Sequence, residues 1–288
     1  MKKITVIQKI KEVYQGKLFL GTEFDDKNTR DQILYGHSFL DDNCTGIVTT
    51  IWASVDVIKK AHELGANLIV CHEALFWNHG DHQEWLEHEK IDTYLRKREL
   101  LDKYQITVWR NHDYAHSGIV VGNKDVDAIF YGLAKVLGWE NYIIGDKSLP
   151  LLFEIPETTA EDLSRYLIDK LNLNGVRLIG NKQTTIKKVK IPFHMFGDAN
   201  EDIKQIDKEE IDAILPLEMV DYSLAEYIKD ASLLGKNKVA ISMGHFNLEE
   251  PGMAYMAKYL KNYVDNSIPV HYVQAGDTYD YITKETFS

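Results

Sequence analysis

The stretch from Gly65 to Trp77, GANLIVCHEALFW, places the strongest constraint on how this chain folds. It begins with a glycine of the kind that ends a helix, continues as the apolar run Leu68 to Cys71, and ends with His72-Glu73. A short apolar run between a helical segment and a loop is typical of a buried parallel strand. In open α/β sheets, ligands bind beyond the carboxyl ends of such strands. His72 and Glu73 therefore lie where a site is expected.

Strand and helix patterns alternate along the first half of the chain, which predicts a parallel sheet with helices on both faces. Ser54 is placed to cap one of these helices and Gly65 to end it. The expected elements are strand Gly46 to Trp52, the helix between Ser54 and Gly65, the strand ending at Cys71, a helix from about Trp85 to Tyr104, strand Ile106 to Trp109 and helix Val126 to Leu137.

The second half repeats this alternation after a middle region of different character. A faint internal echo links the halves, because similar residues precede the strands that lead to His72 and to His245. We therefore predict an α/β protein of two related lobes with mixed, largely parallel sheets flanked by helices, residues 1–140 and 141–288, and a metal site between them. The expected strands are Leu151 to Ile155, Val176 to Ile179, Val189 to Phe193, Ala213 to Leu217 and Val239 to Met243.

Composition narrows the class of protein. Hydrophobic residues make up 44% of the 288, enough for a real core, and no run approaches the roughly 18 apolar residues of a membrane span. A net charge of −11 argues against binding to nucleic acid, which depends on clustered lysine and arginine. Cys44 and Cys71 form no disulfide framework, and the amphipathic N-terminus carries no cleavage signal. We expect a cytoplasmic protein with reduced thiols.

Two further strand ends carry residues that bind metals. After Trp109 come His112, Asp113 and His116, and i,i+4 spacing puts the two imidazoles on one face if the segment is helical. The alternative is a polar loop, and the local sequence favours it. After Met243 come His245 and Glu249. Pro251 predicts that a helix begins at about that residue, so that Glu249 precedes its first turn and has helix capping as its alternative role.

The three clusters fall at the same kind of place, which favours a common site over three unrelated loops. Imidazoles with two or more carboxylates form a mixed nitrogen and oxygen set suited to zinc, iron or manganese. One tetrahedral ion needs fewer ligands than the clusters offer. The pattern therefore predicts two divalent ions that share a bridging carboxylate.

The same segments resemble a known family. ANLIVCHEALFW resembles the segment ending in a His-His pair in the NGG-interacting-factor-three-like proteins, many of which are labelled GTP cyclohydrolase type-two-like. ITVWRNHDYAH resembles the family's strand followed by His-x-x-x-Asp, and GHFNLEEPGMAYMAKYL resembles its closing Gly-His-x-x-x-Glu and helix. The resemblance covers about residues 46 to 275.

The resemblance implies a set of metal ligands. The family's His-His pair falls on His72 and Glu73, and its aspartate falls on His116. His245 and Glu249 match directly. The two departures, Glu73 and His116, compensate in ligand type, so the resemblance implies a retained dinuclear site bridged by Glu249 or Glu73. Asp113 is the alternative to Glu73 as the second carboxylate.

The expected activity is that of a metal-dependent hydrolase acting on a small molecule such as a nucleotide or heterocycle. A metal-activated water would attack, with Asp113 or His112 as the nearest candidates for a general base. The resemblance further implies a homo-oligomer, typically a hexamer. The alternative is a non-catalytic metal-binding regulatory or scaffold protein, and open coordination positions would favour the enzyme. The aromatics Trp52, Phe76, Trp77 and Trp109 are expected in the core, with a stacking wall for a heterocycle as the alternative.

Overall fold

The computed structural model describes residues 1–17, 23–192 and 199–283, and its backbone contacts divide the chain into two compact units. Unit 1 comprises residues 1–132 and 252–275, and unit 2 comprises residues 133–251 and 276–288. Two of the three boundaries fall within helices, α6 (Ala128–Val136) and α10 (His245–Leu260), and the third lies between residues 275 and 276. Residues 252–275 thus return to the first unit, whereas the sequence analysis divides the chain once, at about residue 140.

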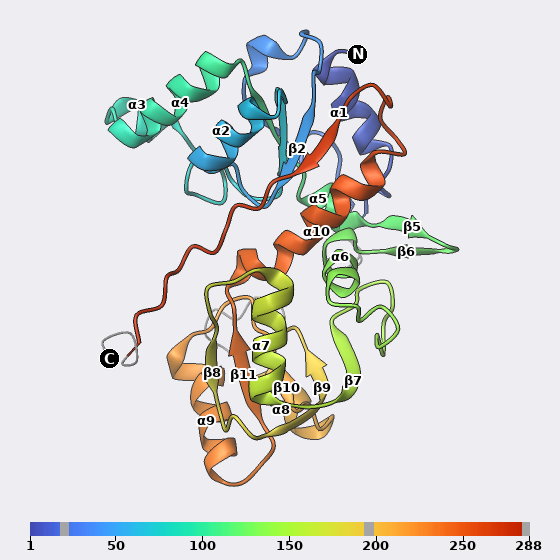
Figure 1. Ribbon diagram of the computed structural model, residues 1–288, viewed down its shortest axis with the longest axis vertical. Helices are drawn as coiled ribbons and strands as arrows, with labels where there is room; N and C mark the ends of the chain where they lie inside the picture. Colours follow the sequence, from blue (N-terminus) through green and yellow to red (C-terminus); the bar gives the residue numbers. More distant parts are fainter. Residues whose placement is uncertain (18–22, 193–198, 284–288) are drawn as a thin grey trace. The chain divides into compact units, whose positions relative to one another are not determined.

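Unit 1 contains a mixed sheet in the order β1-β4-β3-β2-β12, of which Figure 1 labels β2. Its strands β4, β3, β2 and the edge strand β12 are parallel, and the other edge strand, β1, pairs antiparallel with β4. The strands are β1 (Ile33–Tyr35), β2 (Ile47–Thr50), β3 (Leu68–Cys71), β4 (Thr107–Arg110) and β12 (Val270–Tyr272). The helices are α1 (Lys3–Lys11), α2 (Val55–Glu63), α3 (Glu84–His88), α4 (Asp92–Tyr104) and α5 (Asp113–Ser117), with the 3₁₀ turn η1 (His37–Phe39) and the hairpin β5 (Ile119–Val121) and β6 (Lys124–Val126).

Successive residues of β3 pack into different cores, as expected for a strand buried on both faces. Leu68 and Val70 join a cluster that includes residues of α1 and α10, whereas Ile69 and Cys71 join one that includes residues of α2 and α4. The buried parallel strand that the sequence predicts here is therefore confirmed, with helices on both faces of its sheet.

Unit 2 contains a second mixed sheet in the order β7-β9-β10-β11-β8, in which β9, β10 and β11 are parallel and the two edge strands are antiparallel. Helices α8 and α9 share a hydrophobic cluster with β10 and β11. The elements are β7 (Leu152–Thr159), α7 (Ala160–Leu171), β8 (Arg177–Ile179), β9 (Thr185–Lys190), α8 (Asn200–Lys208), β10 (Ala213–Ile214), the π-type turn η2 (Asp221–Ala225), α9 (Glu226–Leu233) and β11 (Val239–Ser242). The predicted fold class, mixed and largely parallel sheets flanked by helices, is confirmed; Phe193 of one predicted strand lies outside the described residues.

Two helix boundaries differ from the prediction. The helix expected from Trp85 to Tyr104 is interrupted, because Lys90 has a φ of 50° in the left-handed region, where a helix cannot continue. The helix expected to begin near Pro251 begins at His245 instead and contains the proline. Its start follows Gly244, whose φ of 94° turns the chain out of the strand. Glu249 therefore lies within the helix, and the prediction that it precedes the first turn is wrong.

Among the described residues, no helix has both the length and the apolar character that crossing a membrane requires.

Candidate metal centre

His72 lies directly beyond the end of β3 and is fully buried. Its position is held by the backbone, because the N–H groups of His72 and Glu73 both donate to the carbonyl oxygen of Ile51. The ring is held as well, because Nδ1 lies 3.2 Å from the carbonyl oxygen of Asn111, at the exit of the neighbouring strand β4. The parallel pairing of β3 and β4 thus brings the two strand ends together.

His112 and His116 share one face of the short helix α5, for which His112 is the N-cap residue. The helical alternative of the sequence analysis is therefore the correct one. The ring centroid of His112 lies 4.4 Å from that of His72, and the His116 centroid lies 5.0 Å from His72 and 4.9 Å from His112. One ring nitrogen from each of the three lies within 4.8 Å of the others. This separation is compatible with a single ion bound by all three.

A buried carboxylate holds α5 in place. Asp31 accepts hydrogen bonds from the backbone N–H groups of His112, Asp113 and Tyr114 at 2.7, 3.0 and 2.7 Å. Burial raises the pKa of Asp31 to about 6. A carboxylate at a helix N-terminus satisfies N–H groups that have no partner within the helix. Asp31 thereby fixes the direction in which His112 and His116 project.

Oxygen acceptors determine which nitrogen of each imidazole carries the proton. The Nδ1 atoms lie 3.2 Å from the Asn111 carbonyl for His72, 3.1 Å from the Asp113 carboxylate for His112, and 2.8 Å from the Asp127 carboxylate for His116. Because these oxygens accept and cannot donate, each Nδ1 is the protonated nitrogen, and the lone pair lies on Nε2. Histidines that bind metals through Nε2 show this pattern of outer partners.

The pKa shifts of His112 and Asp113 fit a neutral imidazole that binds metal and an ionised carboxylate that orients it. Burial, followed by the nearby His72, lowers the pKa of His112 well below its ordinary value, which favours the neutral ring that a metal needs. Burial alone would raise the pKa of Asp113, but hydrogen bonds from His112 and Arg30 hold it below its usual range. The Asp113 carboxylate also accepts from Thr29 Oγ1 and is paired with Arg30 Nη2 at 2.7 Å.

Glu73, which the sequence also predicts as a ligand, is buried against the guanidinium of Arg110. Arg110 is 1% exposed and donates to Glu73 Oε2 at 3.2 Å, to the carbonyl oxygen of His72 at 3.1 Å and to that of His79 at 2.7 Å. The arginine thus joins the segment after β3 to the end of β4. The structure gives Glu73 an ion-pair role beside the ligand role that the sequence predicts.

The loop that follows Glu73 wraps around a buried lysine. Lys97 of α4 donates to the carbonyl oxygen of Leu75 at 2.7 Å, and its ammonium lies 5.3 Å from the Trp52 ring, 5.4 Å from Phe76 and 5.9 Å from Trp77. Phe76 is fully buried, as the core alternative predicts, whereas Trp77 is 48% exposed. The aromatics therefore surround a cation of the chain itself.

Unit 2 carries a second set of ligand-type residues. Gly244 leads from β11 into α10, so that His245 and Glu249 lie one helical turn apart. His245 Nε2 lies 2.9 Å from Glu249 Oε2, and Nδ1 lies 2.7 Å from Glu218 Oε1. Both ring nitrogens of His245 therefore face a carboxylate, whereas the acceptors described in unit 1 face Nδ1. A cavity of about 510 Å³ adjoins it, with His245 and Glu218 among the residues that line it.

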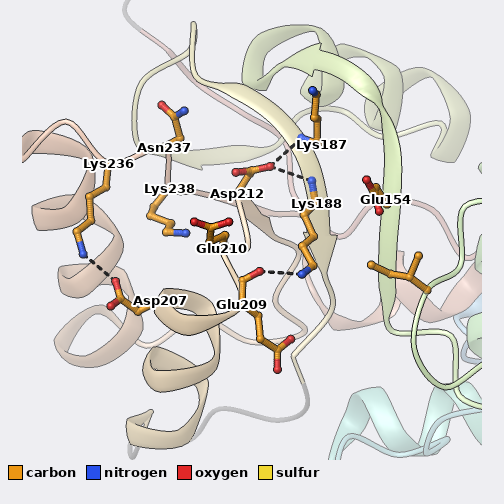
Figure 2. Close-up of a pocket in the computed structure, with 11 residues that line it drawn as sticks. Glu154, Lys187, Lys188, Asp207, Glu209, Glu210, Asp212, Lys236, Asn237 and Lys238 are labelled. Atoms are coloured by element: carbon orange, nitrogen blue, oxygen red, sulfur yellow. Dashed lines mark hydrogen bonds and ion pairs between the residues drawn. The ribbon is translucent and has the colours of Figure 1, made fainter.

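A larger hollow of about 620 Å³ lies at the opposite, amino ends of β9, β10 and β11 (Figure 2). Its charged groups largely satisfy one another. Lys236 pairs with Asp207 at 2.7 Å, and Asp212 accepts from the backbone N–H groups of Lys187 and Lys188. Lys238 donates to two backbone carbonyl oxygens. We therefore place the candidate site at the carboxyl ends, where the histidines lie.

The sequence predicts the histidines of the site, but not most of the carboxylates that hold them in place. The structure brings His72, His112 and His116 together in unit 1, and His245 and Glu249 together in unit 2. Asp31 and Asp127 were missed, although Asp127 has a signal of its own. It precedes a helix and accepts the N–H groups of Ile129 and Phe130, as an N-cap residue does.

Parallel strands that deliver clustered histidines to their carboxyl ends make this an α/β protein with a candidate metal site. The profile of the Duf34/NIF3 family, described as NGG1p interacting factor 3, matches residues 38–277, and the chain belongs to this family. The chain is 25% identical over 250 residues to a GTP cyclohydrolase 1 type 2 homolog of Clostridium perfringens, covering 83% of this chain and 87% of that protein.

Solved structures show the same fold. A Bacillus cereus protein related to NIF3 aligns with a TM-score of 0.69 and 15% identity, covering 98% of this chain and 99% of the other. A Staphylococcus aureus protein aligns with a TM-score of 0.61 and 16% identity over the same shares. The predicted family resemblance is thus confirmed.

Asp127→Asn is expected to weaken metal binding by about 10- to 100-fold, because an asparagine amide cannot hold the proton on His116 Nδ1 as a carboxylate does. Asparagine still caps a helix, so the thermal unfolding temperature should change little. Calorimetric titration with Zn²⁺ measures the affinity, and Asp125→Asn on exposed β6 is the matched control. Equal affinities for the two variants would remove Asp127 from the site.

Proposed function

We propose that this chain is a metal-dependent hydrolase that acts on a small molecule, a nucleotide or heterocycle, as the GTP cyclohydrolase type-two-like label of its relatives implies. The observation that supports it is the group of three imidazoles, each with an oxygen acceptor at Nδ1. Three nitrogen ligands suit zinc or iron, and a zinc site with three protein ligands keeps a position for water or substrate. A divalent ion held there supplies Lewis-acid activation of water and of the bond that is cleaved.

In this proposal the chain's own residues hold and orient the reacting groups. His72, His112 and His116 present Nε2, and Asp127 keeps the proton of His116 on Nδ1. Asp113 is a positioning residue, because its oxygens already accept from Arg30, Thr29 and His112 and its low pKa makes it a poor base. This assignment replaces the general-base role that the sequence suggests for Asp113, and it makes His112 a ligand.

A second ion remains a prediction of the sequence. We propose that His245 and Glu249 of unit 2 bind it, with Glu218 orienting the His245 ring. Glu73 stays a ligand that the family resemblance predicts. The homo-oligomer, typically a hexamer in the family that the chain resembles, likewise stays an expectation.

The test combines metal content with turnover. Full-length protein is stripped with a chelator, reloaded with Zn²⁺, Mn²⁺ or Fe²⁺, and assayed on GTP, other nucleotides, phosphoesters and cyclic amides. We expect up to two ions per chain, metal-dependent hydrolysis of one substrate class, and a loss of metal affinity greater than 100-fold in His112→Ala, since outer partners alone contribute 10- to 100-fold. His88→Ala, at a side chain 83% exposed, is the control.

The alternative function makes a different prediction for the same assay. A regulatory or scaffold protein would bind metal with the same dependence on His112 but hydrolyse none of the substrate classes. Equal metal content in His112→Ala and His88→Ala would instead contradict the metal centre itself.

A further inference from the structure

The cavity beside His245 has the position and size of a substrate pocket. It lies at the carboxyl ends of β10 and β11, where parallel sheets bind ligands, and its volume of about 510 Å³ suits a small molecule. Leu217 and Met243 give it buried apolar surface. Its polar groups decide which ligand it can accept.

Arg177 is the cation in this cavity. It lies on β8 opposite Ser242 of β11, and its Nη2 atom lies 3.4 Å from the Ser242 hydroxyl oxygen. Among the described residues, no carboxylate forms an ion pair with Arg177, although Glu218 and Asp280 also line the cavity. Glu218 is engaged by His245, and Asp280 accepts from the Asn174 side chain. The guanidinium is therefore available for an anionic group, which it can bind through two parallel hydrogen bonds.

A tethered segment of the chain supplies an aromatic wall. Residues 276–283 are held by Asn174, which donates to Asp277 and Asp280 and to the carbonyl oxygen of Tyr279 at 2.9 Å. Tyr281 lines the cavity, and its ring lies against Gly175, where an added Cβ would come within 2.7 Å of the ring. Glycine at 175 thus makes room for the ring. A tyrosine ring beside an arginine offers a face for stacking and a charge for an anion.

We infer that this cavity is a recognition subsite for a planar aromatic or heterocyclic ligand bearing a phosphate or carboxylate, with Arg177 binding the anionic group and Tyr281 contacting the ring. The inference rests on the proposed function, because the subsite adjoins His245. A small molecule bound there would lie beside His245 and Glu249, the residues proposed to bind metal. A guanidinium binds phosphate and carboxylate in the same way, so Arg177 alone does not indicate which of them the bound molecule carries. The test therefore includes one probe of each kind.

Binding is measured by calorimetry on the full-length chain with chelator present, so the result does not depend on metal content or hydrolysis. The probes are AMP, quinoline-2-carboxylate, adenosine and ribose 5-phosphate. We expect AMP or quinoline-2-carboxylate to bind more tightly than adenosine and ribose 5-phosphate, each of which lacks one of the two recognised groups. The tighter of the two anionic probes identifies the source of the anion.

Variants assign the two contacts. Arg177→Gln should weaken binding of the anionic probe by about 10- to 100-fold and leave adenosine unchanged, with Arg177→Lys intermediate. Tyr281→Leu should weaken it by about 5- to 10-fold, whereas Tyr281→Phe retains the ring. Arg165→Gln removes an exposed arginine of the same unit and is the matched control.

The proposal is overturned if neither anionic probe binds below ~10 mM, or if Arg177→Gln and Arg165→Gln bind the anionic probe equally well. The Arg177→Lys variant decides the matter if the glutamine variant fails to fold. If the anionic probe binds as expected but none of the substrate classes is hydrolysed, the proposed enzyme activity is contradicted and the subsite is not.

Discussion

Replacing Glu73 by glutamine is expected to lower the free energy of unfolding by about 3 to 5 kcal/mol in chelator-treated protein. The partner charge, the Arg110 guanidinium, is 1% exposed and cannot reach water once the carboxylate is gone. Glutamine retains the shape and an acceptor oxygen, so the loss measures the charge rather than a cavity. Urea unfolding followed by circular dichroism gives the free energy, and the chelator removes any contribution of bound metal.

A double-mutant cycle separates pairing from other effects. Arg110→Met should also be strongly destabilising, because it leaves the Glu73 carboxylate buried and two backbone carbonyl oxygens without their donor. The double variant Glu73→Gln with Arg110→Met should lose less than the sum, because no buried charge remains. The same cycle on the exposed pair Arg165–Glu161 should give less than about 1 kcal/mol. Additive losses at Glu73 and Arg110 would show that the pair does not interact.

The strands that carry the site were predictable because their signal is local. The apolar runs ending at Cys71 and Trp109 are buried on both faces, so their composition alone indicates parallel strands. β1 and β12 gave no such signal, since each has three residues and owes its pairing to β4 or β2, far away in the sequence. The start of α10 was predicted wrongly from Pro251. Proline is favoured at the first position of a helix, but its φ is helical and it can also lie inside one, as Pro251 does here.

The ligand side chains were predictable to a similar extent. His72, His112 and His116 follow predicted strands, and one rule about strand ends places them together. Their supports follow no such rule. Asp31 binds backbone groups 81 to 83 residues away, and its own surroundings read only as a polar turn region. Arg110 directly follows Trp109, and nothing in the sequence indicates that it is buried or that it pairs with Glu73.

Lys97→Met is expected to change how stability depends on pH. Burial lowers the pKa of Lys97 from 10.5 to about 8, so between these values the unfolded chain binds a proton that the folded chain has released. Stability therefore rises with pH across this window, and below about pH 8 the folded protein carries the full cost of a buried ammonium. The difference in pKa corresponds to on the order of 3 kcal/mol, a substantial share of the stability of an ordinary domain.

Urea unfolding at pH values from 7.0 to 9.5 measures this effect. Relative to Lys97→Met, the unmodified protein should gain about 2 kcal/mol over this range, because the methionine variant has no proton to release. At neutral pH the variant avoids the cost of the buried charge but loses the hydrogen bond to Leu75 and the contacts with Trp52, Phe76 and Trp77, so the two effects offset.

Lys103→Met, at an exposed position on the same helix, reports how far the loss of a lysine alone changes the curve. A constant difference between Lys97→Met and the unmodified protein from pH 7.0 to 9.5 would mean that the ammonium keeps its ordinary pKa. In that case the loop would have to open enough for water to reach Lys97, and the segment that follows His72 and Glu73 would be held less firmly than its contacts with Lys97 imply.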